Sequence, residues 1–139
     1  MSLAVALTDD PSSCFVLRHE VFVQEQAVPE DLERDEHDAT ALHFLAAWEG
    51  RPVGTARVLL RGNTGKIGRV CVLAPMRGRG SGAALIRAAV EEIRARGMAR
   101  AKLGSQVHAI PFYEGLGFVA EGPVYDDAGI PHRDMTLAL

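Results

Sequence analysis

Cysteines are scarce in this sequence, and long apolar runs are missing. The chain has two cysteines, Cys14 and Cys71, which lie far apart and in no metal-binding spacing. This spacing argues against a disulfide framework and against a zinc site, and two free thiols suit a reducing cytoplasm. No segment approaches the roughly 20 apolar residues of a membrane-spanning helix, and no basic leader opens the sequence. We therefore expect a cytoplasmic protein with no metal and no membrane partner.

An excess of positive charge is also missing. The formal net charge of the 139 residues is −3, which argues against a basic nucleic-acid-binding protein. Positive charge is local instead, at Arg69, Arg77 and Arg79. The chain contains no internal repeat, low-complexity tract or linker, and its length is typical of one domain. We therefore expect a single domain over residues 1–139 and no nucleic-acid partner.

The first third of the chain contains one strong helix signal, after a short strand expected at residues 3–7. Asp10 and Pro11 indicate the start of a helix that covers DPSSCFVLRHEVFVQEQ, because proline is tolerated in a first helical turn. Four residues of this helix share one face: Phe15, His19, Phe22 and Gln26. The acidic segment VPEDLERDEHDA follows. It is interpreted either as a solvated loop or as a functional segment.

The middle of the chain predicts three consecutive antiparallel strands. They lie in ALHFLAAWEGRPVGTARVLLRG and in KIGRVCVLAP, with turns at Gly50 and at residues 62–65. Further on, RAKLGSQV predicts a strand, AIPFYEGLGF a short helix, and the last 21 residues two closing strands around a loop. Strands interleaved with helices in this way predict a mixed α/β sheet with helices packed on it.

A clear amphipathic helix begins after Gly80 and ends at Gly97. Its buried side is expected to contain Ile86, Val90 and Ile93, which recur at helical spacing. Two ion pairs are expected on its outer side: Arg87–Glu91 and Glu92–Arg96.

The glycine-rich turn before this helix is the strongest functional signal. A strand that ends in glycines and starts a helix leaves backbone N–H groups unpaired, and the helix dipole adds partial positive charge. Such a turn binds anions, above all phosphate groups, which glycines allow to approach the backbone. Arg77 and Arg79 can add charge-assisted hydrogen bonds. The alternative is a tight turn with solvent-exposed arginines.

Two common nucleotide motifs fit this turn poorly. The Walker A string is absent from the sequence. The dinucleotide fingerprint is partly matched by Gly78, Gly80 and Ala83, but the acidic residue expected about 20 positions further on is missing. A nucleotide-dependent oxidoreductase is therefore only a distant alternative.

A third pattern fits the turn better. Residues 77–82 spell R-x-x-G-x-G after a strand, which resembles the acetyl-CoA motif of the GCN5-related N-acetyltransferases (GNATs). AIPFYEGLGF resembles a second motif of this family, in the expected order along the chain. VFVQEQAVPEDLERDEHD and GIPHRDM further resemble the ElaA/YjcF-type branch. The resemblance thus spans most of the chain.

The resemblance implies a fold and a donor site. The fold is a mixed, mostly antiparallel sheet that is flanked by helices, splays at its fourth strand and holds acetyl-CoA in the gap. The backbone of Val70, Cys71 and Val72 is implied to pair with the pantetheine arm, and an amide near Val72 to polarise the thioester carbonyl. The turn implied to bind the diphosphate consists of Arg77, Gly78, Arg79, Gly80, Ser81 and Gly82. Gln106 stands where many family members have asparagine.

Tyr113 is the predicted general acid, because attack of an amine on acetyl-CoA expels a thiolate that a nearby phenol can protonate. Phe112 and Leu116 are four residues apart and are expected to face the core, which would direct Tyr113 into the cleft. Glu25 is the predicted general base. Three histidines are alternatives, because histidine titrates near neutrality: His43, His108 and His132. A chain of water molecules without a single base is a further alternative.

The acceptor pocket is expected to include Gln26 and His132, which lie in the branch-like strings. Four carboxylates of the acidic segment are expected to attract a cationic acceptor: Glu33, Asp35, Glu36 and Asp38. A covalent acetyl-cysteine at Cys71 is disfavoured, because valines flank this residue in a strand that is expected to be buried.

Together these features predict an N-acetyltransferase that moves an acetyl group from acetyl-CoA directly to a primary amine in a ternary complex. The acceptor is a small molecule or a peptide, and no metal takes part. The alternative is a non-catalytic module that binds or senses acyl-CoA. Homodimerisation is common among such folds and stays open here.

Overall fold

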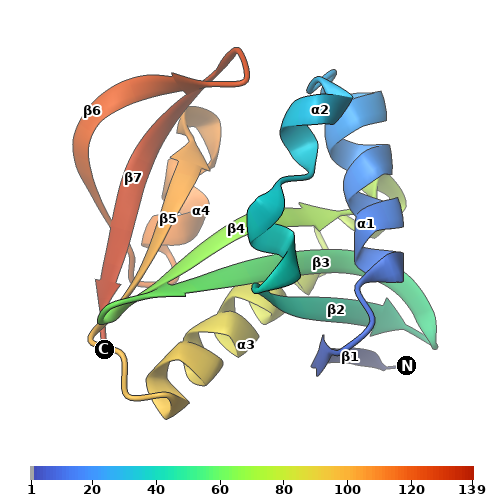
Figure 1. Cartoon of the computed structure of the whole chain (residues 1–139), viewed down its shortest axis with the longest axis horizontal. Helices are drawn as coiled ribbons and strands as arrows, with labels where there is room; N and C mark the ends of the chain where they lie inside the picture. Colours follow the sequence, from blue (N-terminus) through green and yellow to red (C-terminus); the bar gives the residue numbers. More distant parts are fainter. Residues whose placement is uncertain (1) are drawn as a thin grey trace.

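A seven-stranded mixed sheet forms the centre of the fold, in the strand order β1-β2-β3-β4-β5-β7-β6 (Figure 1). The structure is a computed structural model that describes residues 2–139. The strands are β1 (Leu3–Thr8), β2 (Leu42–Trp48), β3 (Arg51–Arg61), β4 (Thr64–Val72), β5 (Arg100–Gln106), β6 (Val119–Asp127) and β7 (Ile130–Ala138). The helices are α1 (Ser12–Arg18), η1 (His19–Glu25), α2 (Glu30–Glu33), η2 (Glu36–Ala39), η3 (Ala74–Met76), α3 (Ser81–Ala95), η4 (Val107–Ala109) and α4 (Ile110–Glu114). The predicted three-strand meander and the mixed sheet with helices on it are confirmed.

The sheet opens between β4 and β5. These strands pair in parallel only where Thr64–Ile67 faces Arg100–Leu103, and no further pair between them follows in the described chain. Figure 1 shows β4 and β5 diverging beyond this short contact. The strands β1 to β4 are antiparallel to one another, and β5, β7 and β6 form a second antiparallel group. The expected sheet, mostly antiparallel and splayed at its fourth strand, is therefore confirmed.

A β-bulge in β4 lies where the two strands begin to separate. Thr55 of β3 faces Cys71, whereas Arg57 faces Gly68, so β4 has one residue more than β3 over this stretch. Arg69 takes up the irregularity, with a left-handed φ of 51°. A bulge bends its strand and increases the local twist, which favours the divergence of β4 from β5.

The bulge also changes which side chains of β4 face the core. Ile67 packs into the main core, and after the extra residue Val70 and Val72 do the same. Cys71 points to the opposite face, where it packs against α1 and η1. Because side chains alternate along a strand, one inserted residue moves every later side chain to the other face. Arg69 is thereby kept out of the apolar core.

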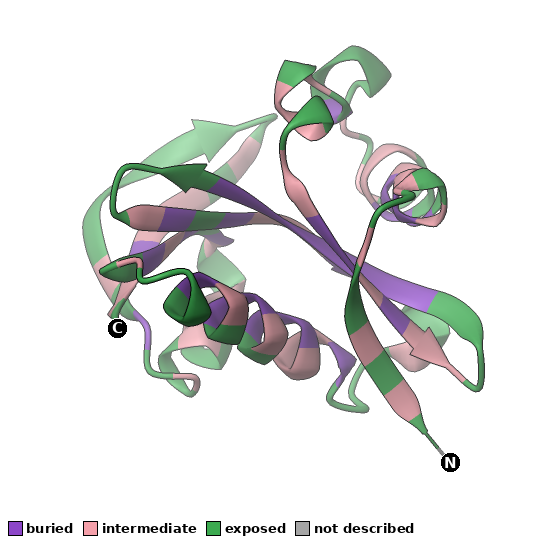
Figure 2. Ribbon diagram, turned by 60° about the horizontal axis from the view of Figure 1, so that its bottom comes forward, coloured by how far each residue is buried: buried purple, intermediate pink, exposed green. Residues whose placement is uncertain are grey.

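Helix α3 covers one face of the sheet (Figures 1 and 2). Its buried apolar residues recur at helical spacing: Leu85, Ile86, Ala89, Val90 and Ile93. They include the three that were predicted, Ile86, Val90 and Ile93. They pack against buried residues of the strands, among them Val58, Ile67, Leu103 and Met135. No helix within residues 2–139 is both long enough and apolar enough to cross a membrane.

Only one of the two ion pairs predicted on α3 forms. Glu92 and Arg96 pair at 2.8 Å between a carboxylate oxygen and Nε. The predicted pair of Arg87 with Glu91 is wrong, because Glu91 pairs with Arg94 instead, three residues further on. Both spacings bring side chains together on a helix surface.

Helices α1 and η1 cover the opposite face of the sheet. The predicted helix is confirmed from Ser12 onward, and its second half widens into the π-helix η1. The side chains that meet the sheet are Cys14, Leu17 and Val21. The four residues predicted to share a face are only partly buried: Phe15, His19, Phe22 and Gln26. The helix therefore contacts the sheet through the neighbouring stripe of side chains.

We expect Gly65→Ala to destabilise the fold. A Cβ on Gly65 would lie 2.5 Å from Cγ1 of the fully buried Ile93, and overpacking of this kind costs about 1–3 kcal/mol. Urea denaturation measures the resulting drop in the free energy of unfolding. Gly68→Ala in the same strand is the control, because nothing lies within 4 Å of its Cβ position. Equal losses in the two variants would contradict this packing argument.

Candidate functional site

The N-terminus of α3 presents backbone amides with no partner among the described residues. Gly80 is the N-cap residue, with φ of 85°, and no side chain caps the helix. The bond from the Ala84 N–H to the Gly80 carbonyl, at 3.0 Å, is the start of the helical pattern. The preceding amides of Ser81, Gly82 and Ala83 are therefore free to donate. Amides arranged in this way, at the positive end of the helix dipole, bind an anion.

The loop before α3 leaves these amides accessible. Gly78 and Gly80 both have a positive φ, and no atom lies within 4 Å of their Cβ positions. Arg79 is exposed beside them. The buried hydroxyl of Ser81 has no hydrogen-bond partner in the part of the chain that the structure describes. Free amides and an available guanidinium group suit a diphosphate.

Arg77 points away from this loop and toward the end of η1. Its Nε donates to the Val72 carbonyl at 2.9 Å, and its two terminal nitrogens bind both carboxylate oxygens of Glu25, at 2.6 and 2.8 Å. Hydrogen bonding from Arg77 lowers the pKa of Glu25. A carboxylate with a lowered pKa is a weak proton acceptor at neutral pH. The role of Glu25 as general base stays a prediction, and this geometry disfavours it.

The separated part of β4 carries the three residues expected to contact the donor. Val70 and Val72 are partly buried and pack on the core. Cys71 is 5% exposed. Burial raises the pKa of its thiol to about 12, so the thiol stays neutral, which supports the expectation that Cys71 is not a nucleophile.

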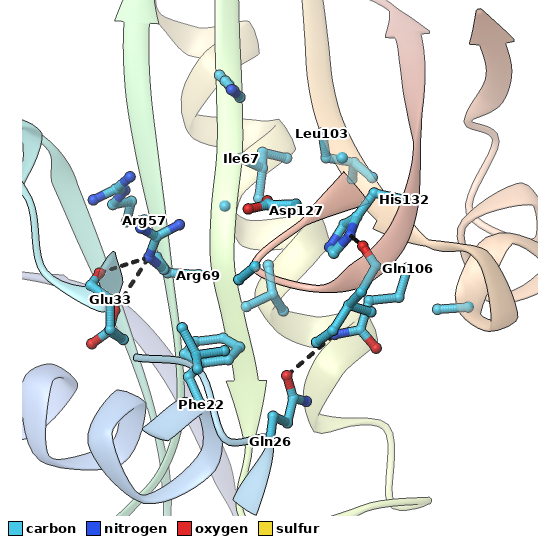
Figure 3. Close-up of a pocket in the computed structure, with 18 of the residues that line it drawn as sticks. Phe22, Gln26, Glu33, Arg57, Ile67, Arg69, Leu103, Gln106, Asp127 and His132 are labelled. Carbon is cyan, nitrogen blue, oxygen red and sulfur yellow. Dashed lines mark hydrogen bonds and ion pairs between the residues drawn. The ribbon is translucent and has the colours of Figure 1, made fainter. Parts of the chain in front are cut away.

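A cavity of about 460 Å³ adjoins the separated strands, between η1 and α2 on one side and β6 and β7 on the other. Figure 3 shows Phe22 and Arg69 on one wall and Gln106 and His132 on the opposite wall. Four of the predicted site residues line this cavity: Gln26, Val70, Tyr113 and His132. The structure therefore brings together residues from the beginning, middle and end of the chain.

Tyr113 lines this cavity, and its hydroxyl makes no hydrogen bond to another described residue. Its ring packs edge-on against Phe112 and Phe118, with centroids 5.0 and 6.2 Å away. Burial raises the pKa of Tyr113 to about 12, so the phenol keeps its proton at neutral pH and can donate it. The expectation that Phe112 faces the core is wrong, because it is 43% exposed beside Gly82 of α3. Leu116 does pack against the core.

A chain of hydrogen bonds crosses from η1 to the end of β5. The side-chain amide of Gln106 donates to the Gln26 side-chain carbonyl at 3.2 Å. Nε2 of His108 lies 2.7 Å from the side-chain oxygen of Gln106. Gln106 therefore connects the two sides of the opening, a role that its position in the sequence alone does not indicate.

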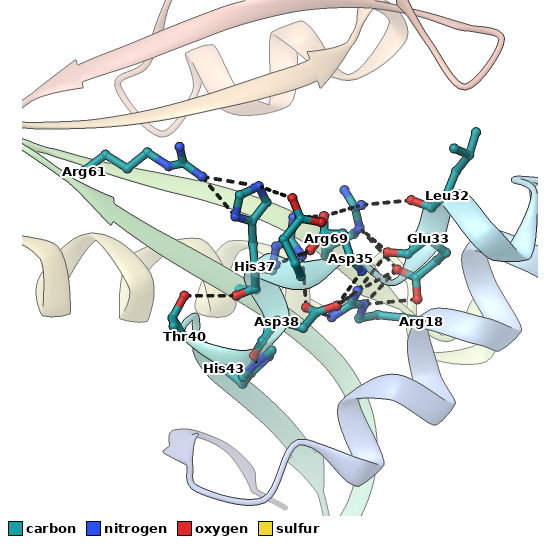
Figure 4. A network of polar contacts seen from close by, with 12 residues as sticks. Arg18, Leu32, Glu33, Asp35, His37, Asp38, Thr40, His43, Arg61 and Arg69 are labelled. Carbon is teal, nitrogen blue, oxygen red and sulfur yellow. Dashed lines mark hydrogen bonds and ion pairs between the residues drawn. The ribbon is translucent and has the colours of Figure 1, made fainter.

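Some carboxylates of the acidic segment point into the protein and away from solvent. Glu33 is 3% exposed, and it accepts hydrogen bonds from Arg18 at 2.7 Å and from Arg69 at 3.2 Å. Asp38 binds Arg18 at 2.8 Å and Arg57 at 2.9 Å. Figure 4 shows how these contacts tie the segment to α1 and to the strands behind it. The interpretation as a solvated loop is therefore wrong for these residues.

Asp35 completes this network, at 2.8 Å from Arg57 and 3.4 Å from Arg69. Three carboxylates thus face three guanidinium groups. Burial alone would raise the pKa of Asp38, but hydrogen bonds from two arginines hold it well below its ordinary value. The three carboxylates are already paired with arginines, so the expectation that they attract a cationic acceptor stays a prediction, and this geometry disfavours it. Glu36, outside the network, is exposed.

The three histidine alternatives lie in different surroundings. His43 is buried, its Nε2 lies 2.9 Å from the Asp38 carbonyl, and its ring packs edge-on against Phe15. His108 is exposed and contacts Gln106. Of the three, His132 lines the cavity.

Comparison with known proteins agrees with this architecture. A family profile described as "Acetyltransferase (GNAT) domain" matches residues 6–139. The chain therefore belongs to the GNAT acetyltransferase family. This membership makes it an enzyme of the acyl-CoA-dependent N-acetyltransferase class.

Individual relatives point to one branch of that family. The chain is 36% identical over 122 residues to the uncharacterized N-acetyltransferase YjcF of Bacillus subtilis, covering 87% of each chain. It superposes on Escherichia coli ElaA with a TM-score of 0.82 and 27% identity, covering 98% of both chains. An acyl-CoA N-acyltransferase from Pseudomonas aeruginosa gives a TM-score of 0.87 at 29% identity, with 99% of this chain and 100% of that chain covered. The resemblance to the ElaA/YjcF-type branch is confirmed.

We expect Asp38→Asn to lower stability at neutral pH by about 3 kcal/mol, because it leaves three guanidinium groups, two of them almost fully buried, facing only two carboxylates. The folded-state pKa of Asp38 lies below its unfolded value, so the stability it contributes is present above about pH 4 and is lost as the pH falls further. Urea denaturation at several pH values measures both effects. Asp31→Asn, at an exposed position of the same segment, is the control. A loss for Asp38→Asn no larger than that of the control would contradict this account.

Proposed function

We propose that this protein transfers an acetyl group from acetyl-CoA to a primary amine of a small molecule or peptide, by direct attack in a ternary complex. The observation that carries this proposal is the set of unpaired amides at the start of α3, directly beside the separated part of β4. A donor with a diphosphate and an amide-containing arm fits both features. Homodimerisation stays open, and the predicted cytoplasmic location stays a prediction.

The donor is proposed to lie along the opening of the sheet. The diphosphate contacts the loop and the first turn of α3 through Gly78, Arg79, Gly80, Ser81 and Gly82. The pantetheine arm adds to the backbone edge of Val70, Cys71 and Val72 that β5 leaves uncovered, and an amide near Val72 donates to the thioester carbonyl. Arg77 lies beside the proposed donor position and, through its ion pair with Glu25, connects the end of η1 to β4. The thioester then faces the cavity.

The proposed reaction needs one proton donor and one proton acceptor. The amine nitrogen attacks the acetyl carbonyl carbon, the new C–N bond forms, and the C–S bond to coenzyme A breaks. Tyr113 donates its proton to the leaving thiolate, which its raised pKa permits because the phenol is fully protonated at neutral pH. The alternative, a module that only binds acyl-CoA, predicts affinity for acetyl-CoA without thiol release in the presence of any amine.

We expect Gly80→Glu to weaken acetyl-CoA binding at least tenfold, which corresponds to about 1.4 kcal/mol. The new carboxylate lies next to the unpaired amides at the start of α3 and repels the diphosphate. Isothermal titration calorimetry measures the affinity. Gly97→Glu is the matched control, since it places the same charge at a similar φ of 77° beyond the other end of α3. Unchanged affinity in a folded Gly80→Glu variant would contradict the proposed diphosphate site.

We expect Tyr113→Phe to lower kcat by about 100-fold, because the thiolate then leaves without a proton donor. Thiol release with a panel of primary amines measures turnover. The affinity for acetyl-CoA should stay the same, since the phenol ring and its packing are retained. Equal turnover in the variant and the unmodified protein would remove Tyr113 from the mechanism.

A further inference from the structure

The ion pairs described above disfavour two carboxylates as the base that takes a proton from the amine, Glu25 and Glu33. The Glu25 carboxylate is bound at both oxygens by Arg77. The Glu33 carboxylate, although it lines the cavity, is bound by Arg18 and Arg69. A base must present a free acceptor atom to the substrate, and His132 is the histidine of the cavity wall.

The hydrogen bond at one ring nitrogen of His132 determines which nitrogen is the acceptor. Nδ1 lies 2.7 Å from the backbone carbonyl oxygen of Ile130. A carbonyl oxygen only accepts hydrogen bonds, so Nδ1 carries the proton. In the neutral ring, Nε2 then has a lone pair and no proton. Nε2 has no partner within residues 2–139.

Three neighbouring strands hold this ring in place. The Tyr125 ring of β6 stacks on His132, with centroids 6.0 Å apart and the planes inclined by 24°. The Tyr125 hydroxyl donates to Asp134 of β7 at 2.8 Å. It passes over β5 at Gly104, where a Cβ would overlap the hydroxyl. The orientation of His132 is therefore fixed by backbone and side chains from β5, β6 and β7.

The contacts with Ile130 and Tyr125 orient the His132 ring beside the opening of the sheet. His132 faces Gln106 in the β5–β7 register, at the end of β5 that has already separated from β4. Figure 3 shows its ring on the wall opposite Phe22 and Arg69. Tyr113, the proposed acid, lines the same cavity. A base and an acid thus border one space next to the proposed thioester position.

We propose that His132 is the general base of the acetyl transfer, with Nε2 as the atom that accepts the proton of the amine. This inference rests on the proposed function. Nε2 takes one proton from the ammonium group and releases it to solvent, which leaves a neutral amine. After attack, Nε2 takes the second proton from the nitrogen of the tetrahedral intermediate, and the thiolate takes the Tyr113 proton. The imidazolium proton returns to the phenolate, so one proton leaves per turnover.

Other ionisable groups on the strands, on α2 and on α4 also face the cavity: Glu33, Arg57, Lys66, Arg69, Tyr113, Tyr125 and Asp127. Asp127 is the alternative proton acceptor among them, since its carboxylate stands on β6 near the turn into β7. The experiment therefore compares variants of both residues.

We expect His132→Asn to lower kcat/KM at least about 100-fold while acetyl-CoA affinity stays unchanged. Asparagine keeps an N–H donor for the Ile130 carbonyl but has no base. Asp127→Asn should change kcat/KM much less. The pH profile of kcat/KM should have an acidic limb that persists when a less basic amine replaces the acceptor. This limb should disappear in His132→Asn. Added imidazole should restore part of the activity of His132→Ala.

A measurement without any acceptor separates this inference from the proposed function. Long-range ¹H–¹⁵N NMR on the unmodified ¹⁵N-labelled protein at alkaline pH should show the Nδ1–H tautomer of His132, with its signal assigned by its loss in His132→Asn. An Nε2–H tautomer, or a variant with unchanged rate and pH profile, would overturn the role of His132. Absence of thiol release with every amine, together with the Nδ1–H tautomer, would instead reject the proposed function.

Discussion

The separation of β4 from β5 after Ile67 and Leu103 is the constraint on which the whole site depends. Backbone groups inside a sheet are normally paired, and leaving them without partners costs free energy. The bulge at Arg69 bends β4 away from its neighbour at this point. The chain then passes through η3 and the glycine loop into α3, whose first amides are also unpaired. One extended ligand can therefore satisfy the strand edge and the helix start together.

The ion-pair network fixes the position of one wall of the cavity. Arg18 and Arg57 are almost fully buried and bind carboxylates of the segment that includes α2 and η2. The balance of three positive and three negative charges lets these groups be buried together, since each would be costly alone. Arg69 joins the network from the bulge itself. The geometry of β4 and the position of the cavity wall are thus coupled.

The local signals of the sequence were sufficient for most of the elements and for the uncapped start of α3. Pro11, the glycine turn and the amphipathic pattern of α3 each act within a few residues. The bulge is visible in the sequence only indirectly. The core-facing residues Ile67 and Val70 are three positions apart, whereas regular alternation along a strand requires two or four. The pairing of Glu25 with Arg77 joins residues 52 positions apart, so no local pattern predicts it. No local pattern predicts the buried ion pairs either. In the sequence, the only sign of them is that Arg18, Arg57 and Arg69 lie within apolar runs.

The two halves of the site differ in how they are connected to the core. Val70, Val72 and Tyr113 pack against the main core, whereas Phe22, Gln26 and His132 do not belong to it. Substitutions on the acceptor side therefore disturb the packing less than substitutions on the donor side. In the course of evolution such an arrangement allows new acceptors to be acquired while the donor is retained. Divergence among relatives outside the ElaA/YjcF-type branch should accordingly concentrate on η1, β6 and the turn into β7.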